Sequence, residues 1–417
     1  MKQTSCSSDT GRFIGLDVHK HYITIGGMNA QQEFVLRPRN VEMERFRDWA
    51  AQNLRLNDKL VLEATTNTWD IYDIVLPLVA EVQVAHPAEV KQIANARVKT
   101  DKRDVERLIR LLITGSVPKV WVPPTEVRQL RALLAYRWRL VKMGTMIQNR
   151  LHSLLHSHNI AAPEGKIHTA ENLVWWQKLS LSPLEDLRLK QELELLQQIR
   201  VNIEVVEAEL GRLSNREPWA SQAVYLLQLP GVGIIVTMTA LAAIGEISRF
   251  ENPKRLVGYA GLGAGVHDSG ETHRGKRITK YGRKELRWAM IEAAWQAIRS
   301  NPHWRAEYER LCQRKPANQA IVAIARKLLV TIWYVLSQKE PYKRFNADDL
   351  AYKMLTWAWH IDETALNGMT RQQFAKYGLM RLGVGEQLTR IVRGKYPRRI
   401  APAEEILALK PELAKKS

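Results

Sequence analysis

The 417-residue chain contains only two cysteines, Cys6 and Cys312. Two thiols are too few for a disulfide framework or for a zinc site built from thiolates, so the composition fits a reducing compartment. The N-terminal residues lack the apolar core of a signal peptide. No apolar run reaches the roughly 18 residues that would predict a transmembrane helix. We therefore expect a cytoplasmic protein with no membrane partner.

Acidic residues are in deficit, because 43 Asp and Glu stand against 62 Lys and Arg and give a formal net charge of +19. An excess of this size indicates a polyanionic partner, and nucleic acid is a commoner one than an anionic membrane surface. A basic protein that charge merely keeps soluble is the alternative until the charges are shown to cluster. The length predicts two or three domains, and 45% hydrophobic residues are typical of a globular chain.

The first 116 residues alternate between strand-like and helix-like segments. Strands are expected at 13–18, 22–28, 33–36, 59–64 and 82–85. Helical spacing occurs at 41–51, 69–80 and 101–113. Three strands followed by strands that alternate with helices predict an α/β sheet that starts as an antiparallel meander. We assign residues 1–116 to one α/β domain.

Three prolines follow Val117 in the segment VPKVWVPP, and this composition predicts a linker. Apolar residues then recur near coiled-coil spacing from Leu130 to Leu154, where Arg137 and Gly144 interrupt the stripe. A cleaner repeat follows at 196, 199, 203, 206, 210 and 213. Residues 117–216 are therefore expected to form a linker and a coiled-coil arm. This arm either packs on itself or dimerises, and two ordinary bundle helices are the alternative.

Two further parts complete the predicted organisation. Residues 217–340 are expected to form a mostly helical domain that is rich in glycine and basic residues. Residues 341–417 form a C-terminal extension of mixed character that carries the basic run RIVRGKYPRR. The sequence indicates no role for this extension.

Four acidic residues occupy positions where a metal site can be built. Asp17 lies mid-strand in GLDVHK, where a buried charge is costly unless it is paired or binds a metal. Glu63 lies near the end of the strand KLVLEA, and Asp101 and Asp104 share one face of a predicted helix. Neighbouring strands and a helix packed on them would bring all four together as oxygen ligands for Mg²⁺. Such ions assist phosphoryl transfer.

Each acid also has a simpler interpretation, such as a helix N-cap for Asp101 and a surface residue for Glu63. The four together are more persuasive than any one alone. Basic residues surround the last pair, namely Lys99, Lys102, Arg103 and Arg107. These suit a phosphate backbone near a metal site, although a solvated helix face has the same composition.

The blocks GLDVHK, VLEAT and VKTDKRDVERL resemble the N-terminal domain of the IS110 family of insertion-sequence transposases. The resemblance covers the first predicted domain and implies a RuvC-like RNase H fold with a DEDD acidic set. That set carries over to Asp17, Glu63, Asp101 and Asp104, as catalytic residues and Mg²⁺ ligands.

Residues 226–246, LLQLPGVGIIVTMTALAAIGE, predict a helix, a tight turn and a second helix, as in a helix-hairpin-helix motif. Gly231 and Gly233 permit the sharp turn. The free N–H groups at the start of the second helix can bind a DNA phosphate without reading bases. A turn that serves packing alone is the alternative.

Ser269 lies on a predicted glycine-rich loop just before a basic segment. A serine hydroxyl is a weak nucleophile, so the residues alone favour a turn role. Tyr259 and Tyr281 are rival nucleophiles. His19, with His267 and His273, is a candidate proton carrier whose simpler role is a supporting one. The candidate nucleic-acid contacts of the segment are Arg274, Lys276, Arg277, Lys280, Arg283 and Lys284.

This segment is similar to the C-terminal transposase domain of the same family. The matching residues are Gly261, Leu262, Ser269, Gly270, Lys280, Gly282, Leu286 and Arg287, while Ala264 replaces a proline. The resemblance implies that Ser269 attacks DNA and forms a phosphoserine link, with the acidic domain of a partner subunit completing the site. It also implies a dimer or tetramer and guidance by a structured noncoding bridge RNA, as in the IS1111 subgroup.

Three hypotheses follow. The first is a recombinase that excises and inserts an insertion-sequence element in double-stranded DNA. The second is a RuvC-like nuclease that uses only the acids on branched DNA. The third is an architectural or RNA-binding protein without catalysis. The length of the second half and its SGE and GKRITKYG blocks count against the nuclease, and the intact acidic set counts against the architectural protein.

Overall fold

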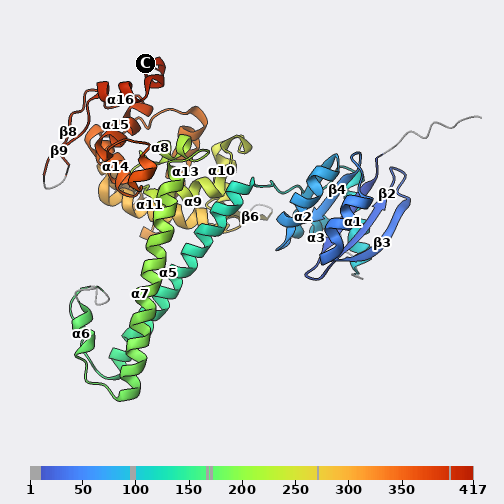
Figure 1. The fold of residues 1–417 in the computed structure, drawn as a ribbon, viewed down its shortest axis with the longest axis horizontal. Coiled ribbons are helices and arrows are strands. Elements are labelled where there is room, and N and C mark those ends of the chain that lie inside the picture. Colours follow the sequence, from blue (N-terminus) through green and yellow to red (C-terminus); the bar gives the residue numbers. More distant parts are fainter. Residues whose placement is uncertain are drawn as a thin grey trace, which may run out of the picture. The chain divides into compact units, whose positions relative to one another are not determined.

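The computed structural model describes residues 11–93, 100–165, 169, 172–269, 272–393 and 396–416. At 173, 266–269, 272–277 and 414–416 it describes the backbone and not the side chains. The chain forms two compact units that divide between Pro123 and Pro124 (Figure 1). The first unit is a mixed α/β sheet domain and the second is mostly helical, as the sequence predicts at this level.

A five-stranded sheet in the order β3-β2-β1-β4-β5 forms the first unit. The strands are β1 (Phe13–Val18), β2 (Tyr22–Met28), β3 (Phe34–Glu42), β4 (Lys59–Glu63) and β5 (Glu81–Ala85). β1, β2 and β3 pair antiparallel, whereas β4 runs parallel to both β1 and β5. The predicted antiparallel meander is confirmed.

β3 is longer than the predicted 33–36, because it pairs with β2 as far as the Tyr22–Glu42 register. It is an edge strand with mostly exposed polar residues, so the apolar pattern does not mark its length. The predicted helix at 41–51 therefore begins later, as the 3₁₀ turn η1 (Met43–Arg45) and α1 (Phe46–Asn53).

Helices cover both faces of the sheet. α1, α2 (Thr68–Val75) and the 3₁₀ turn η2 (Leu76–Leu78) lie on the face to which the even-numbered side chains of β1 and β4 point. α3 (Pro87–Ile93) and α4 (Asp101–Ile113) lie on the opposite face, with Val61 of β4 and Met28 of β2. The alternation follows from the two-residue period of a strand. Odd-numbered residues of β1 and β4 therefore face α4.

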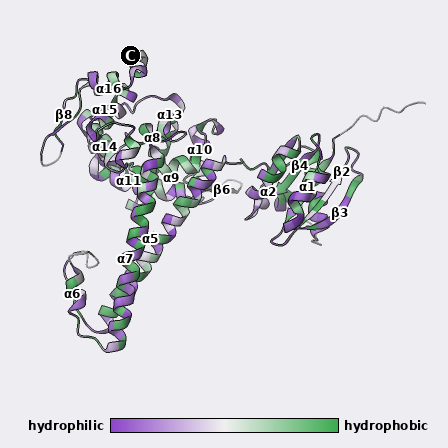
Figure 2. Ribbon diagram, viewed as in Figure 1, coloured by the Kyte–Doolittle hydropathy of each residue, from purple (hydrophilic) through white to green (hydrophobic). Residues whose placement is uncertain are grey.

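The second unit begins with two long helices, α5 (Thr125–Ser157) and α7 (Pro183–Ser214), with the short α6 (Leu173–Gln177) between them in sequence. They lie side by side and extend from the helical body (Figure 1). Hydrophobic and hydrophilic residues alternate along both (Figure 2). Three ion pairs show that they run antiparallel, Arg137–Glu207, Arg150–Glu192 and His158–Glu185.

The two interruptions of the α5 stripe both face α7. Arg137 Nε donates to Glu207 Oε1 at 2.9 Å, so the charge inside the seam is paired. Gly144 is buried, and Ile199 of α7 lies 3.6 Å from the place of an added Cβ. The hairpin therefore packs on itself, which is one of the two predicted arrangements of the arm.

The helical body is built around α9 (Ile234–Ile244), α11 (Lys284–Ser300) and α13 (Ala317–Gln338). α8 (Ala220–Leu227), η4 (Ile247–Arg249), α10 (Pro253–Tyr259) and α12 (Pro302–Cys312) surround them. α13 is long and apolar enough to span a membrane by length and composition, yet 50% of its apolar stretch is buried in this unit. It packs against α10 and α11 and is a core helix.

A two-stranded ribbon, β6 (Ala264–Ser269) and β7 (Thr272–Ile278), emerges from this body. The C-terminal extension folds with the same unit as α14 (Ala347–Trp359), η5 (Glu363–Leu366), α15 (Arg371–Arg381), β8 (Arg390–Ile391), β9 (Arg398–Arg399), α16 (Ala403–Leu409) and η6 (Pro411–Lys416). The buried Lys376 donates to the carbonyls of Gly385, Glu386 and Leu388 and holds the chain after α15 in place.

Candidate functional site

Asp17 and Glu63 lie on the sheet face that α4 covers. Both have odd numbers, as has Val61, whose side chain packs with α4. Leu16 pairs with Leu62 across the parallel strands β1 and β4, so Asp17 and Glu63 are the next residues along neighbouring strands. The strand register therefore places these two acids on neighbouring strands of one face, whereas the group of close ligand atoms found among the described residues comprises Asp17, His19 and Asp101 and not Glu63.

Two glycines let α4 approach this face closely. Gly15 of β1 pairs with Gly26 of β2. A Cβ at Gly15 would lie 2.7 Å from Ile109 Cγ1 and 2.9 Å from the Val105 carbonyl, and one at Gly26 would lie 3.0 Å from Val105 Cγ1. Because these side chains are missing, the helix lies directly on the sheet, and its first turn, with Asp101 and Asp104, reaches Asp17.

Asp17 and Asp101 meet around the imidazole of His19. His19 Nε2 lies 3.2 Å from Asp17 Oδ2 and 3.4 Å from Asp101 Oδ2. One ligand atom from each of the three side chains lies within 4.8 Å of the others. Tyr22 donates its hydroxyl hydrogen bond to Asp101 Oδ2 at 2.9 Å. Carboxylate oxygens and an imidazole nitrogen so arranged fit a divalent cation.

The electrostatics of this cluster favour a bound cation. Burial raises the pKa of Asp17 above its usual value, His19 acts in the opposite direction, and Asp101 and Asp104 raise it further. Asp104 is oriented by Arg107, whose Nη1 lies 3.1 Å from Asp104 Oδ1. A divalent cation between these carboxylates would offset their mutual repulsion.

The sequence identifies the four acids but gives His19 only a supporting role and does not single out Tyr22. His19 follows Asp17 by two residues, a spacing that keeps both on one side of an extended chain. Its Nε2 is buried and, among the described residues, has no partner in hydrogen-bond geometry. Tyr22 starts β2 on the α4 face. The two-residue period of side chains along a strand is the sequence feature that could have identified both His19 and Tyr22.

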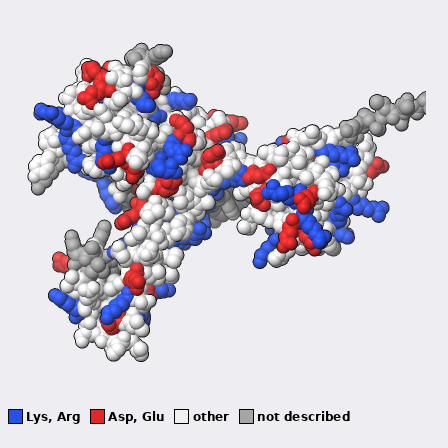
Figure 3. Space-filling model, viewed as in Figure 1, with Lys and Arg blue, Asp and Glu red and all other residues white. Residues whose placement is uncertain are grey.

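The basic residues predicted beside the acids are only partly described. Lys99 lies outside the described residues, and Lys102 is exposed on the first turn of α4. On the face drawn in Figure 3, Lys and Arg are interspersed with Asp and Glu over each unit. The basic residues do not form a single patch on this face, so the charge distribution seen there does not by itself locate a nucleic-acid site.

Ser269 is the last residue of β6 and pairs with Thr272 of β7. The predicted loop is thus wrong at Ser269, because this residue belongs to a strand of a β-ribbon. The side chains of Ser269, Arg274, Lys276 and Arg277, and the whole of Gly270, lie outside the described part. Alternating Gly and polar residues hid the strands from an apolar pattern.

The base of this ribbon is held by two glycines in the left-handed region. Gly261 has φ +65° and Gly282 has φ +101°. Cβ atoms there would lie 2.3 Å from the Tyr281 carbonyl and 2.2 Å from the Tyr259 carbonyl, respectively. Arg287 Nη1 donates to the Ala260 carbonyl at 2.9 Å and binds the two crossing segments together. The positive φ angles and these close contacts therefore explain why glycine occupies positions 261 and 282.

The remaining candidates at the ribbon differ in exposure. Lys280 and Lys284 are exposed, and Arg283 is half-buried at the start of α11. Tyr281 is 84% exposed, whereas the hydroxyl of Tyr259 donates to the Ala243 carbonyl at 3.3 Å. Tyr259 is therefore engaged in packing.

The LPGVG turn joins α8 to α9, as the helix-hairpin-helix pattern predicts. Gly231 has φ +76°, and a Cβ there would lie 2.1 Å from the Ala293 carbonyl of α11. Gly233 is the N-cap of α9 and has extended backbone. The turn thus packs through Gly231 and begins a helix through Gly233.

Two family models match the sequence. One describes the transposase of the IS110 family with a DEDD domain and matches residues 14–160, which include all four acids. The other describes the transposase of the IS116/IS110/IS902 family and matches residues 223–309, which include Ser269 and the LPGVG turn. The DEDD domain implies a divalent metal, in agreement with the cluster around Asp17.

Curated relatives give the same family. The chain is 24% identical to the transposase for insertion sequence element IS1111A of Coxiella burnetii, over 80% of this chain and 91% of that one. It is 28% identical to the putative transposase y4qE of Sinorhizobium fredii, over 56% of this chain and 57% of the relative. The pilin gene-inverting protein of Moraxella bovis is 27% identical over 68% of this chain and 82% of its own. The chain belongs to the IS110 family of DNA transposases.

Proposed function

We propose that the protein excises and inserts an insertion-sequence element, with Asp17, Glu63, Asp101 and Asp104 holding Mg²⁺ and Ser269 acting as the nucleophile. The observation that carries the proposal is the contact of Asp17, Asp101 and His19 beneath α4. Support for a RuvC-like RNase H fold comes from the antiparallel β1–β2–β3 meander followed by parallel β4 and β5.

The side chains around the metal position have separate tasks. Asp17 and Asp101 supply oxygen ligands, and Glu63 and Asp104 complete the set from the neighbouring strand and the next helical turn. Tyr22 and Arg107 orient Asp101 and Asp104 by hydrogen bonds. A Mg²⁺ ion held by these residues would supply positive charge beside a phosphate oxygen of the substrate. The chemistry suits a phosphodiester because its oxygens match the hard cation.

In the proposed strand cleavage, Ser269 Oγ attacks the phosphorus of a DNA phosphodiester. A bond between Oγ and phosphorus forms, the bond from phosphorus to one sugar oxygen breaks, and the serine proton passes to that oxygen as it leaves as a hydroxyl. Joining reverses the step with a new hydroxyl, so no high-energy cofactor is consumed. Support comes from the position of Ser269 at the end of β6, paired with β7, and from the basic residues in the sequence of β7.

The proposed partners are double-stranded DNA at the element ends and target, a bridge RNA, and further copies of the chain. Because the acids and Ser269 belong to different units, an assembly in which subunits share sites would form a complete centre. The α5–α7 hairpin is the proposed dimerisation arm of a dimer or tetramer. RNA guidance rests on the family resemblance alone. Since its substrate is chromosomal DNA, we expect the protein to act in the bacterial cell interior.

The decisive experiment uses the full-length protein, its guide RNA, Mg²⁺ and labelled element-end DNA. We expect a protein–DNA adduct that survives denaturation, disappears with Ser269→Ala and is severely reduced with Asp17→Asn. Ser221→Ala, an exposed serine on α8, is the matched control and should form the adduct normally. Strand joining by Ser269→Ala would overturn the serine mechanism. Cutting that releases free ends and needs only the acids would identify a RuvC-like nuclease instead.

A further inference from the structure

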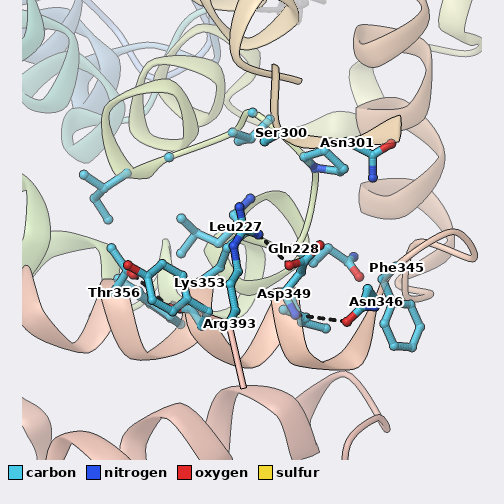
Figure 4. A pocket seen from close by; sticks show the side chains of 18 of the residues that line it. Leu227, Gln228, Ser300, Asn301, Phe345, Asn346, Asp349, Lys353, Thr356 and Arg393 are labelled. Carbon is cyan, nitrogen blue, oxygen red and sulfur yellow. Dashed lines mark hydrogen bonds and ion pairs between the residues drawn. The ribbon is translucent and has the colours of Figure 1, made fainter. Parts of the chain in front are cut away.

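A cavity of about 270 Å³ lies between the α8–α9 turn and the C-terminal extension (Figure 4). Gly231 and Gly233 of the turn line one part of its wall, and Lys353 of α14 and Arg393 after β8 line another. Ser300, at the end of α11, lines the wall across the hollow from Lys353. The helix-hairpin-helix segment and the C-terminal extension, for which the sequence indicated no role, thus both line this cavity.

The two glycines of the turn differ in what fixes them. Gly231 is required by its positive φ and by the close carbonyl of Ala293. Gly233 has an extended φ of −98°, and a Cβ there would meet nothing within 4 Å. Neither backbone strain nor crowding therefore requires glycine at position 233. Its missing side chain leaves the start of α9 open, without a side-chain cap for its first N–H groups.

Three basic side chains line the cavity, Arg344, Lys353 and Arg393. Lys353 Nζ donates to the carbonyl of Leu229, which is a neutral acceptor. Burial lowers the pKa of Lys353 to about 7, Arg393 adds to this effect, and Asp349 acts against it. Arg393 Nη1 lies 2.6 Å from Asp349 Oδ1, so the single carboxylate of this group is already engaged. An anion in the cavity would restore the charge balance of Lys353.

The floor of the cavity holds a further donor. Gln228 is 3% exposed, and its Oε1 accepts from the backbone N–H of Tyr342 at 2.8 Å. Its Nε2 is buried and has no hydrogen-bond partner among the described residues. Buried donors without partners are rare in folded proteins and indicate a missing acceptor. The wall therefore includes one buried donor, Gln228 Nε2, whose acceptor is missing among the described residues.

We propose that this cavity binds a phosphate group of the DNA backbone, held by the first N–H groups of α9 together with Lys353 and Arg393. Helix N-termini and cationic side chains are the groups that bind phosphates in proteins. This inference rests on the proposed function for its ligand, duplex DNA, and gives the C-terminal extension a role as half of a phosphate clamp. A contact of this kind positions the duplex without reading its sequence.

Position 233 offers a matched pair of variants that spare the fold. Asp and Asn are both favoured helix N-caps, so Gly233→Asp and Gly233→Asn should keep or raise the thermal unfolding midpoint. Gly233→Asp places a negative charge at the proposed phosphate position and should weaken binding to duplex DNA at least tenfold more than Gly233→Asn does. Lys353→Met tests the other side of the clamp, and Lys315→Met, an exposed lysine outside the cavity, is its control.

The measurement is affinity for a labelled duplex at several salt concentrations. Lys353→Met should lower the slope of log affinity against log salt by roughly 1, the effect of one lost phosphate contact, while Lys315→Met leaves it unchanged. An unchanged affinity and slope in both Gly233→Asp and Lys353→Met would overturn the clamp. A loss confined to a labelled RNA duplex would overturn the assignment to DNA. The adduct assay at saturating DNA tests the serine mechanism independently. A normal adduct yield together with these losses in affinity would support the clamp and leave the serine mechanism intact.

Discussion

The hydroxyl of Tyr22 donates a 2.9 Å hydrogen bond to the carboxylate of Asp101. It joins the first residue of β2 to the first residue of α4, and the charged acceptor raises the pKa of the tyrosine. The imidazole of His19 lies 4.7 Å from the ring of the same tyrosine, measured between centroids. Tyr22 therefore contacts two of the three residues of the candidate metal cluster, Asp101 through its hydroxyl and His19 through its ring.

Tyr22→Phe keeps the ring and removes the hydrogen bond. We expect the Mg²⁺ concentration needed for half-maximal adduct formation to rise roughly tenfold, the usual effect of losing a group that orients a metal ligand. Saturating Mg²⁺ should restore most of the activity, because the ligands remain. Tyr334→Phe, at an exposed tyrosine of α13 outside this cluster, serves as the control. A loss of activity that no Mg²⁺ concentration restores would assign Tyr22 a different role.

Asp17→Asn removes a charge that burial and two neighbouring acids disfavour. In the presence of a chelator, its thermal unfolding midpoint should equal or exceed that of the wild type, because the repulsion from Asp101 and Asp104 is gone. DNA cleavage should fall by roughly a hundredfold or more, since metal assistance contributes several kcal/mol. A destabilised Asp17→Asn protein would instead show that the carboxylate has a structural role.

Gly15→Ala tests whether the approach of α4 to the sheet builds the cluster. The added Cβ would lie 2.7 Å from Ile109 Cγ1 and must push the helix outward. We expect a loss of about 1–3 kcal/mol in the free energy of unfolding and a disproportionate loss of cleavage. Gly258→Ala on α10, where a Cβ meets open space, should change neither. Full cleavage activity in Gly15→Ala would show that the acidic cluster does not depend on the close approach of α4 to the sheet.

Gly282→Ala tests the base of the β6–β7 ribbon. A side chain at φ +101° is strained by about 1–2 kcal/mol and would also meet the carbonyl of Tyr259. We expect adduct formation by Ser269 to fall strongly while thermal unfolding of the sheet unit, followed by hydrogen exchange of β1, is unchanged. An adduct yield equal to that of the wild type would show that the crossing of these segments does not position the serine.

The pKa of Lys353, lowered from 10.5 to about 7, predicts opposite effects of pH on stability and on binding. Between pH 7 and 10.5 the unfolded chain binds more protons at this lysine than the folded chain does, so its contribution to stability increases as pH rises. The charged lysine present at lower pH favours an anion, so DNA affinity should decrease as pH rises through 7. Lys353→Met should lose both dependences, as denaturant titrations and binding isotherms at pH 6 and 8 would reveal.

The sequence predicts the sheet unit well because its strands are buried. β1, β2 and β4 carry apolar runs, β5 alternates Val82 and Val84 with polar residues, and α4 has the predicted bounds 101–113. β3 is misjudged because an edge strand that carries Arg37, Pro38 and Arg39 shows no apolar alternation. The face assignments of Asp17 and Glu63 follow from strand period, so the pairing of these acids is accessible without coordinates.

The rest of the candidate sites depends on contacts that spacing does not encode. Tyr22 meets Asp101 only because Gly15 and Gly26 pair and admit α4. Lys353 and Gly233 are far apart in sequence, and only Gly233 belongs to a recognisable pattern, the LPGVG turn. The open start of α9 is visible only once the space around Gly233 is known. Long-range packing, not composition, decides these relationships.

The division of the chain at Pro123 and Pro124 has a genetic consequence. A substitution at Asp17 and one at Ser269 damage separately packed units, and each leaves the other unit intact. Two defective alleles, one with Asp17→Asn and one with Ser269→Ala, would therefore complement each other in one cell when subunits share their sites. If subunits share their sites in this way, an element copy damaged in one unit would stay mobile while a second copy, damaged in the other unit, supplied the missing residue.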